Sequence, residues 1–285
     1  MAHRPASWKL DLDDPRAPSQ EEWDAMSPEE RDYVVASLPS EFEATEAAPP
    51  EGDEHTEQVY GARTALKRHF RHQGRGVYIG TNLPVYYPGQ TMFSPDVIAV
   101  LDVDPHPRSS WVVSREKKGL DFAMEVIVLG HRRKDLERNV RRYAELGIDE
   151  YFVFDRPRLR LFGYRLEDDS RCYEPVLAQH GKYHSRVLGL SLAIDGERLR
   201  FFVGDAALPF ADEVIDKLEG WVGGLESRLA DAEARAEEEA KRAEQQAERA
   251  KEEAERAKQE AERADAAEGR LRELLAELER LRRER

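Results

Sequence analysis

The sequence lacks several features that would place a protein in a class at once. Cys172 is the only cysteine among 285 residues, which excludes a disulfide framework and a cysteine metal site. The longest apolar runs, VIAVL and VIVL, have the length of a strand, which excludes an integral membrane protein. No apolar segment follows Met1, so we expect no secretory signal and a cytoplasmic location. There is also no glycine-rich loop with the spacing of a nucleotide phosphate site.

Positive charge is also in deficit, because 44 basic residues face 58 acidic ones and the net charge is −14. Taken alone, this argues against a nucleic-acid partner. The excess acid lies at the ends, however: residues 1–60 carry −12, residues 225–285 carry −4, and residues 61–224 carry +2. Basic residues cluster in this middle part, notably Arg132, Arg133, Lys134, Arg138, Arg141 and Arg142. Such clusters are most often solvated helix faces, but the composition leaves DNA open as a partner.

The N-terminal part, residues 1–50, is acidic and contains repeated proline. Within it, the sequence SPEE at 27–30 predicts one short helix that ends before Pro39, with serine as the N-cap and proline in the first turn. Residues 43–54 have the composition of a linker. We therefore expect an acidic arm with a short helix.

The middle part, residues 51–209, contains alternating helix and strand patterns. Helical spacing of apolar residues marks 54–72 and 132–146, and buried strands are expected at 93–103, 121–130 and 151–155. Two short strands are expected on either side of 82–84, and additional edge strands at 160–166, 186–194 and 199–203. This order predicts an α/β (α+β) domain with a mixed β-sheet flanked by helices.

A connecting helix is expected over 210–224, and residues 225–285 have the composition of a long helix. Alanines from Ala243 to Ala264 alternate four and three residues apart, which is a heptad pattern. Leucines continue the seam after a phase slip near Gly269. We expect a coiled coil that joins copies of the chain into a homo-oligomer through residues 225–285. The alternative is a solvated single helix held by ion pairs.

One pair of acids stands out in the middle part. Glu125 interrupts an otherwise apolar strand, and a buried carboxylate must find a partner. If Asp96, at the start of the preceding strand, lies alongside, the two could bind Mg²⁺ or Mn²⁺, which lowers the pKa of a bound water. The alternatives are turn chemistry for Asp96 and a salt bridge from Glu125 to a helix arginine.

The motifs PDV at 95–97, EV at 125–126 and Y-x-x-x-G-I-x-E-Y-x-x-x-D at 143–155 occur in an order and spacing that resembles the Uma-two family of bacterial putative restriction endonucleases. The resemblance covers about residues 52–205 and implies a PD-(D/E)XK nuclease fold. It implies that Asp96 and Glu125 bind Mg²⁺ and that a bound water attacks a DNA phosphodiester. The helix that begins near residue 54 would add Glu54 or Glu57 as a further ligand, with His55 beside them. Asp135 and Tyr143 match the family's helix after the glutamate strand.

The chain departs from the family pattern at Asn139, where the family carries a lysine that acts near the phosphate. Lys134 or Arg138 is a candidate to supply the charge from another position. Two functions therefore stay open. One is a Mg²⁺-dependent DNA endonuclease in which Asn139 or Lys134 assists catalysis. The other is a catalytically weak or inactive nuclease-fold module that binds or assembles through its coiled coil, with no membrane partner in either case.

Overall fold

The computed structural model describes residue 5 and residues 8–40, 52–128, 132–167 and 170–283. They belong to two compact units, which we call the body (Met1–Val214) and the tail (Ile215–Arg285). No helix among these residues has the length and apolar character needed to span a membrane. The two units are described separately below.

A six-stranded mixed sheet forms the centre of the body, in the order β1-β3-β5-β6-β7-β8. Strands β5 and β6 are parallel, and every other neighbouring pair is antiparallel. The crossover between the parallel strands carries a π-helical turn (Lys134–Arg138) and helix α5 (Asn139–Glu145). This confirms the predicted mixed sheet with flanking helices. The strands are β1 (Val77–Gly80), β3 (Val97–Leu101), β5 (Phe122–Ile127), β6 (Glu150–Asp155), β7 (Arg160–Leu166) and β8 (Tyr173–Pro175).

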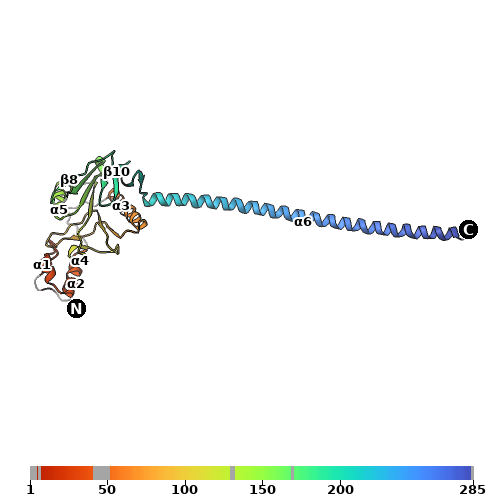
Figure 1. Cartoon of the computed structure of the whole chain (residues 1–285), viewed down its shortest axis with the longest axis horizontal. Coiled ribbons are helices and arrows are strands. Elements are labelled where there is room, and N and C mark those ends of the chain that lie inside the picture. The colour runs from red at the N-terminus through yellow and green to blue at the C-terminus, as the bar shows by residue number, and fades with distance from the viewer. Residues whose placement is uncertain (1–4, 6–7, 41–51, 129–131, 168–169, 284–285) are drawn as a thin grey trace. The chain divides into compact units, whose positions relative to one another are not determined.

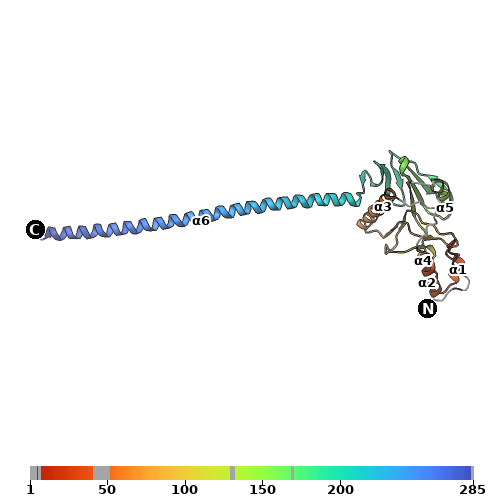
Figure 2. The same ribbon diagram turned by 180° about the vertical axis from the view of Figure 1, so that it is seen from behind.

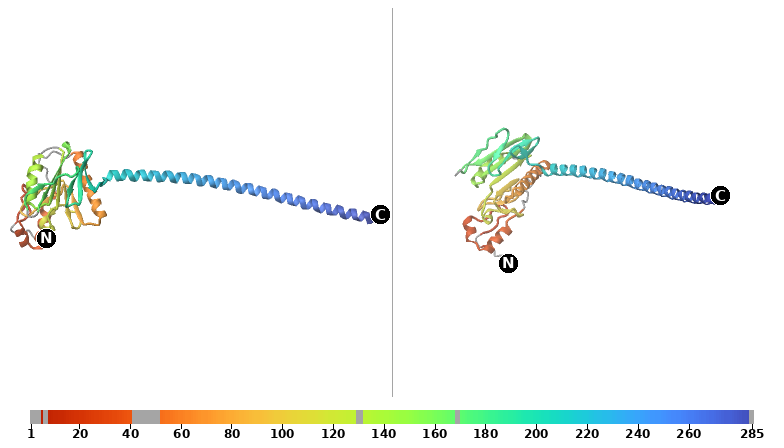
Figure 3. Two further views of the ribbon diagram at one scale, coloured as in Figure 1. Left: turned by 45° about the horizontal axis from the view of Figure 1, so that its top comes forward. Right: turned by 45° about the vertical axis from the view of Figure 1, so that its right-hand side comes forward.

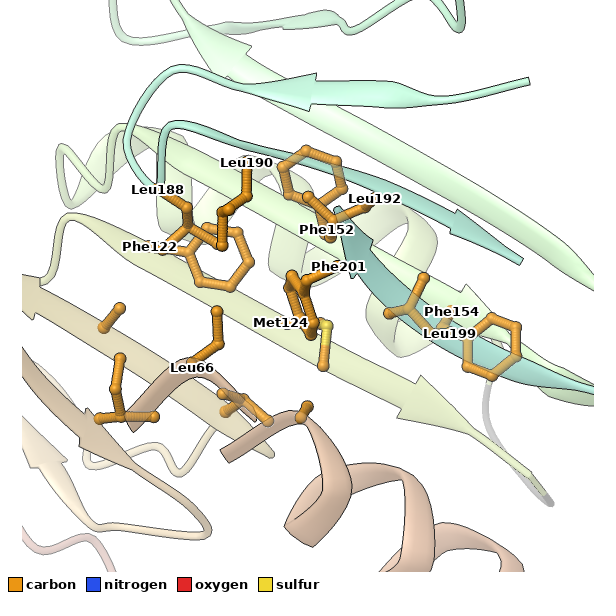
Figure 4. Close-up of a cluster of buried hydrophobic side chains, with 14 of the residues drawn as sticks. Leu66, Phe122, Met124, Phe152, Phe154, Leu188, Leu190, Leu192, Leu199 and Phe201 are labelled. Atoms are coloured by element: carbon orange, nitrogen blue, oxygen red, sulfur yellow. The ribbon is translucent and has the colours of Figure 1, made fainter. Parts of the chain in front are cut away.

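One face of this sheet packs against helix α3 (Asp53–His72) and a second, four-stranded sheet in the order β12-β11-β10-β9. Figure 4 shows their apolar side chains meeting between the strands. Helix α3 faces the sheet because Val59, Ala62, Leu66 and Phe70 recur at helical spacing and are all buried. The strands of the second sheet are β9 (Tyr183–Ser185), β10 (Leu190–Asp195), β11 (Arg198–Val203) and β12 (Ala206–Ala207).

The prediction of additional edge strands is wrong in their placement. Strand β7 lies inside the central sheet between β6 and β8, and β10 and β11 belong to the second sheet. An alternating pattern shows which side chains of a strand are buried, but it does not identify the neighbouring strand. The core between the two sheets explains the pattern, because Leu190, Leu192, Leu199 and Phe201 all point into it.

The opposite face of the central sheet packs against α5 and against a small parallel pair, β2 (Val85–Tyr86) and β4 (Trp111–Val112). A short helix, α4 (Val113–Glu116), follows β4 and lies beside two N-terminal helices (Figures 1 and 2). Arg115 of α4 forms an ion pair with Asp32 at 2.6 Å, and Ser114 donates a hydrogen bond to Gln20 at 3.1 Å.

The N-terminal part contains two helices, α1 (Gln20–Ala25) and α2 (Pro28–Ser37), rather than one. Helix α2 confirms the prediction made from SPEE, and the same capping box at Ser19 and Glu22 starts α1. The helices bury Trp23 and Val34 in a cluster that also contains residues of β2 and β4. Residues 43–51 of the predicted linker lie outside the described residues, and 53–54 already belong to α3.

The segments expected as a connecting helix and a separate coil form one helix, α6 (Ala211–Arg283), whose ribbon is uninterrupted in Figures 1 and 3. Ion pairs at i, i+4 lie along it, such as Lys241 with Glu237 at 2.7 Å and Arg242 with Glu238 at 2.6 Å. Such pairs contribute only a few tenths of a kcal/mol each. The coiled coil stays a prediction.

The N-terminal helices are expected to contribute to the stability of the body. Replacing buried Trp23 by alanine removes most of a side chain from the cluster with β2 and β4, and should lower the free energy of unfolding by about 3–5 kcal/mol. Leu12→Ala, in the same segment but exposed, should change it by less than about 0.5 kcal/mol. Urea unfolding followed by near-UV circular dichroism measures both. Equal, small effects would mean that these helices do not stabilise the body.

Candidate active site

Asp96 and Glu125 lie opposite each other on neighbouring strands. Glu125 is in β5, and Asp96 comes directly before β3, the antiparallel neighbour of β5. The register pairs Val97 with Met124, so the next residues along are Asp96 and Glu125. The backbone N–H of Asp96 lies 3.4 Å from Glu125 Oε2, and the N–H of Val126 donates to Asp96 Oδ2 at 2.6 Å. The backbone register of β3 and β5 therefore brings the two carboxyl groups together.

Both carboxyl groups are buried, with 7% of Asp96 and 5% of Glu125 exposed. Burial raises the pKa of Glu125 well above its ordinary value of 4.5, and the charges of Asp96 and Asp135 raise it further. The positive charge of Lys134 acts in the opposite direction. Among the described residues, no arginine or lysine forms an ion pair with either carboxylate, so the alternative of a salt bridge from Glu125 to a helix arginine does not hold.

Helix α5 supplies two side-chain hydrogen bonds to Glu125. The Tyr143 hydroxyl donates to Glu125 Oε1 at 3.0 Å, and Asn139 Nδ2 donates to the same oxygen at 3.3 Å. Asn139 Nδ2 also donates to Asp135 Oδ1 at 3.1 Å. Spacing of four residues places Asp135, Asn139 and Tyr143 on one side of the helix, facing β5. Burial and the negative charge of Glu125 raise the pKa of Tyr143, which keeps its hydroxyl protonated as a donor.

The residue of α3 that contacts the pair is His55. Its Nε2 lies 3.0 Å from Asp96 Oδ2, and the imidazole is buried. Glu54 instead forms an ion pair with Arg156 at 2.8 Å, and Arg156 also pairs with Glu197 at 3.0 Å. Glu57, the other acid named from the resemblance, is exposed and lines a different surface groove. Within the described ranges, no group of three or more His, Cys, Asp or Glu side chains is arranged to hold a metal ion.

Lys134 lies outside the buried cluster, on the surface of the π-helical turn. It lines an open groove of about 540 Å³ together with Arg133, Glu137, Arg138 and Arg141. Of these side chains only Glu137 is acidic, and it forms an ion pair with Arg133 at 2.8 Å. The groove is therefore positively charged, and the effect of Lys134 on the pKa of Glu125 links it electrostatically to the carboxyl pair.

The sequence alone does not indicate the hydrogen-bond partners of the two carboxyl groups. The family resemblance places His55 beside the helix acids and matches Asp135 and Tyr143 to the family's helix, without assigning them to Asp96 or Glu125. The i, i+4 spacing of Asp135, Asn139 and Tyr143 was a usable signal, because it places three polar groups on one side of a helix that follows a strand with a buried acid.

Comparison with known proteins gives a family match and a similar solved structure. Residues 43–195, more than half of the chain, match the model of the Uma2 family, which is described as "Putative restriction endonuclease". Among solved structures, "a putative nuclease belonging to DUF820" from Anabaena variabilis is similar, with 12% sequence identity and a TM-score of 0.39. That match covers 50% of this chain and 76% of the other. No curated protein matches the sequence.

The raised pKa of Glu125 predicts a pH-dependent stability. The folded state holds this proton more tightly than the unfolded chain does, so its contribution to stability is full below about pH 4.5 and is lost as pH rises through the folded pKa. Glu125→Gln removes the charge and keeps the shape. In the presence of a chelator at pH 8, the Glu125→Gln variant should have a free energy of unfolding about 1–3 kcal/mol higher, because about that much is the usual penalty for a poorly compensated buried polar group.

Thermal denaturation in EDTA at pH 5 and pH 8 measures the effect, and the gain should be smaller at pH 5. Glu174→Gln, on the exposed part of β8, is the matched control and should have no effect at either pH. A Glu125→Gln variant that is less stable at pH 8 than the parent chain would contradict the raised pKa.

Proposed function

Because this chain belongs to the Uma2 family of putative restriction endonucleases, we propose that it is a metal-dependent DNA endonuclease of the PD-(D/E)XK class. The observation that carries the proposal is that the register of β3 and β5 places two buried carboxyl groups, Asp96 and Glu125, opposite each other, with the Asp96 amide 3.4 Å from Glu125 Oε2. Such a cluster lowers the stability of the fold, because each buried charge raises the energy of the other. Buried acids with perturbed pKa values are typical of functional sites.

The donor set fits a hard divalent cation, Mg²⁺ or Mn²⁺. Asp96 and Glu125 offer oxygen ligands, and a cation would compensate the two negative charges that burial leaves uncompensated. Among the described residues, the candidate ligand set consists of these two carboxylates, with His55 in contact with Asp96. Mg²⁺ tolerates such a site, because it is commonly held by one or two carboxylates and keeps water and phosphate oxygens as its other ligands. When bound, it would lower the pKa of a water molecule and stabilise negative charge on the phosphate.

The other residues of the cluster position these two ligands. Tyr143 and Asn139 orient Glu125, while the Val126 amide and His55 orient Asp96. Each of these partners is buried, so the carboxyl groups have little freedom to rotate. Asn139 supplies hydrogen bonds but no charge. In this proposal Lys134 provides the positive charge near the scissile phosphate, from the rim of the cluster.

The basic groove supports DNA as the substrate. Four basic residues and one acid line it, which gives a net charge of +3, and one of the four is Lys134, whose charge acts on Glu125. Positive side chains bind the phosphates of a duplex without reading its sequence. Binding through so few cations should be modest and should weaken as salt concentration rises.

Cleavage of plasmid DNA tests the proposal. The wild-type chain should nick supercoiled plasmid with Mg²⁺ or Mn²⁺ and not in EDTA. Asp96→Asn and Glu125→Ala should each reduce the rate by about 100-fold or more, because each removes a proposed metal ligand. Glu174→Ala, prepared in the same way, is the control for contaminating nucleases and should cleave like wild type. Equal cleavage by all four proteins would overturn the proposal.

The second function, a catalytically weak or inactive nuclease-fold module, is favoured by one observation: a neutral amide, Asn139, occupies the buried position between Glu125 and Asp135. Calorimetric titration with Mn²⁺ separates the two functions. Metal binding that Asp96→Asn abolishes supports the enzyme, whereas the absence of any metal binding supports the module.

Restoring a charge at this position gives a gain-of-function prediction. Asn139→Lys would place an ammonium group between Glu125 and Asp135 and near a bound phosphate, so we expect the nicking rate with Mg²⁺ to rise by about 10-fold to 100-fold. Asn139→Met, whose side chain is similar in length to that of lysine but neutral, should not increase the nicking rate. Rates from single-turnover cleavage measure both variants. A stably folded Asn139→Lys protein with no gain would show that this position does not contribute charge to the reaction.

A further inference from the structure

A single column of apolar residues runs along the whole tail at a spacing of seven. It contains Ile215, Val222, Leu229, Ala236, Ala243, Ala250, Ala257, Ala264, Leu271 and Leu278. Helix α6 includes all ten positions without interruption, so the column itself continues past Gly269, while the apolar residues between its members change their spacing there, from Ala261 to Ala267. The predicted alanine seam begins at Ala243 and the predicted coiled coil at residue 225, so the column begins before both.

A strict seven-residue repeat has a geometric consequence. In a straight α-helix such a column drifts around the axis by about 20° per heptad, so over nine intervals it would move by about half a turn. It stays on one side only if the helix coils around a partner. Ten consecutive apolar residues at this spacing therefore favour a supercoiled pair over a solvated single helix.

The first part of the tail has the strongest seam. Leu218 and Leu225 lie at the d positions between the column residues, and Ile215 to Leu229 alternate apolar residues three and four apart. All of these side chains are more than half exposed in the single chain. The helix here also contains Gly220, Gly223 and Gly224, which disfavour an isolated helix. Their heptad positions are f, b and c, so the glycines face away from the seam.

We propose that the tail pairs in parallel with the tail of a second copy of this chain, through a seam that begins at Ile215. The seam is self-complementary, because in-register pairing places large residues against large ones at both ends and alanine against alanine between them. Parallel pairing also brings Arg228 at a g position beside Glu233 at the e position of the other copy. A membrane or an unrelated protein would not require an apolar column that keeps a spacing of seven over nine successive intervals.

The apolar area is sufficient for a specific interface. Large apolar side chains of the tail that are more than half exposed would each lose on the order of 60 Å² on pairing. Two copies would then bury roughly 1,200 Å², the lower end of the range for specific interfaces, before the alanines are counted. These side chains are Ile215, Leu218, Trp221, Val222, Leu225, Leu229, Leu271, Leu274, Leu275 and Leu278.

The two ends of the tail carry the pairing. Between them the column is alanine, and the second row of alanines (Ala247, Ala254 and Ala261) lies at e positions, while the d positions hold Glu239, Gln246, Glu253 and Glu260. Alanine buries little area and acids at d positions oppose close approach, so this middle part contributes little. Substitutions near Ile215 should therefore have a larger effect than substitutions among the alanines.

Sedimentation equilibrium of the full chain tests the proposal independently of nuclease activity. Wild type should have twice the chain mass of 32.7 kDa at micromolar concentration. Leu225→Glu with Leu229→Glu should give the mass of one chain, with a dissociation constant raised at least 100-fold. Ser227→Glu with Ala234→Glu adds the same charges on the outer f positions and should remain a dimer. A monomeric wild type, or a dimeric Leu225→Glu/Leu229→Glu protein, would overturn the proposal.

Thermal denaturation of the body, recorded for each variant, should be unchanged and would show that the loss of mass is not unfolding. Orientation is tested by cross-linking in a Cys172→Ser background, which removes the native exposed thiol. Leu225→Cys should form a disulfide between two copies under mild oxidation, and Ser227→Cys should not. A dimer in which Leu225→Cys fails to cross-link would overturn the parallel register.

Discussion

The body is organised around one unfavourable interaction, the burial of the Glu125 carboxyl group opposite Asp96 in the middle of a sheet. Burial and the neighbouring charges raise the pKa of Glu125, so this position costs stability at neutral pH rather than adding to it. The surrounding contacts reduce that cost. Tyr143 and Asn139 donate hydrogen bonds to Glu125, and the Val126 amide donates to Asp96. A buried acid with a raised pKa that lowers stability is typical of a functional site, and the proposed function gives Glu125 such a role.

The layers of the fold meet at this pair. The parallel strands β5 and β6 require a crossover, and the crossover carries α5 onto the face of the sheet toward which Glu125 points. Helix α3 packs on the opposite face, yet its first turn brings His55 to Asp96 at the end of β3. Arg156, directly after β6, forms ion pairs with Glu54 in that first turn and with Glu197 between β10 and β11. Residues from three separate parts of the chain thus fix two carboxyl groups.

Much of the fold and of the candidate site could be predicted from local sequence patterns. The predictions that were wrong or missing have a common cause. Helical spacing located α3, and capping chemistry located α2, because both signals act within a few residues. The resemblance identified Asp96 and Glu125 by spacing. The placement of β7, β10 and β11 was wrong, because strand partners are set by contacts distant in sequence. The contact between His55 and Asp96 was not foreseen for the same reason: it joins a helix to a strand end 41 residues later on the opposite side of the sheet.

The residue at position 139 shows how charge balance connects stability to the proposed chemistry. A lysine there would lie between Glu125 and Asp135 and would partly neutralise them in the absence of a metal ion. An asparagine satisfies the same oxygens but leaves the negative charges uncompensated, which raises the energy of the metal-free cluster. The same uncompensated charge strengthens the attraction for a divalent cation. In the proposed reaction, an asparagine at this position also provides no fixed positive charge to stabilise the transition state of phosphate hydrolysis. Under the proposed function, Asn139 would therefore favour the binding of a cation over rapid turnover, and a slow nuclease and a metal-binding module would then differ only in degree.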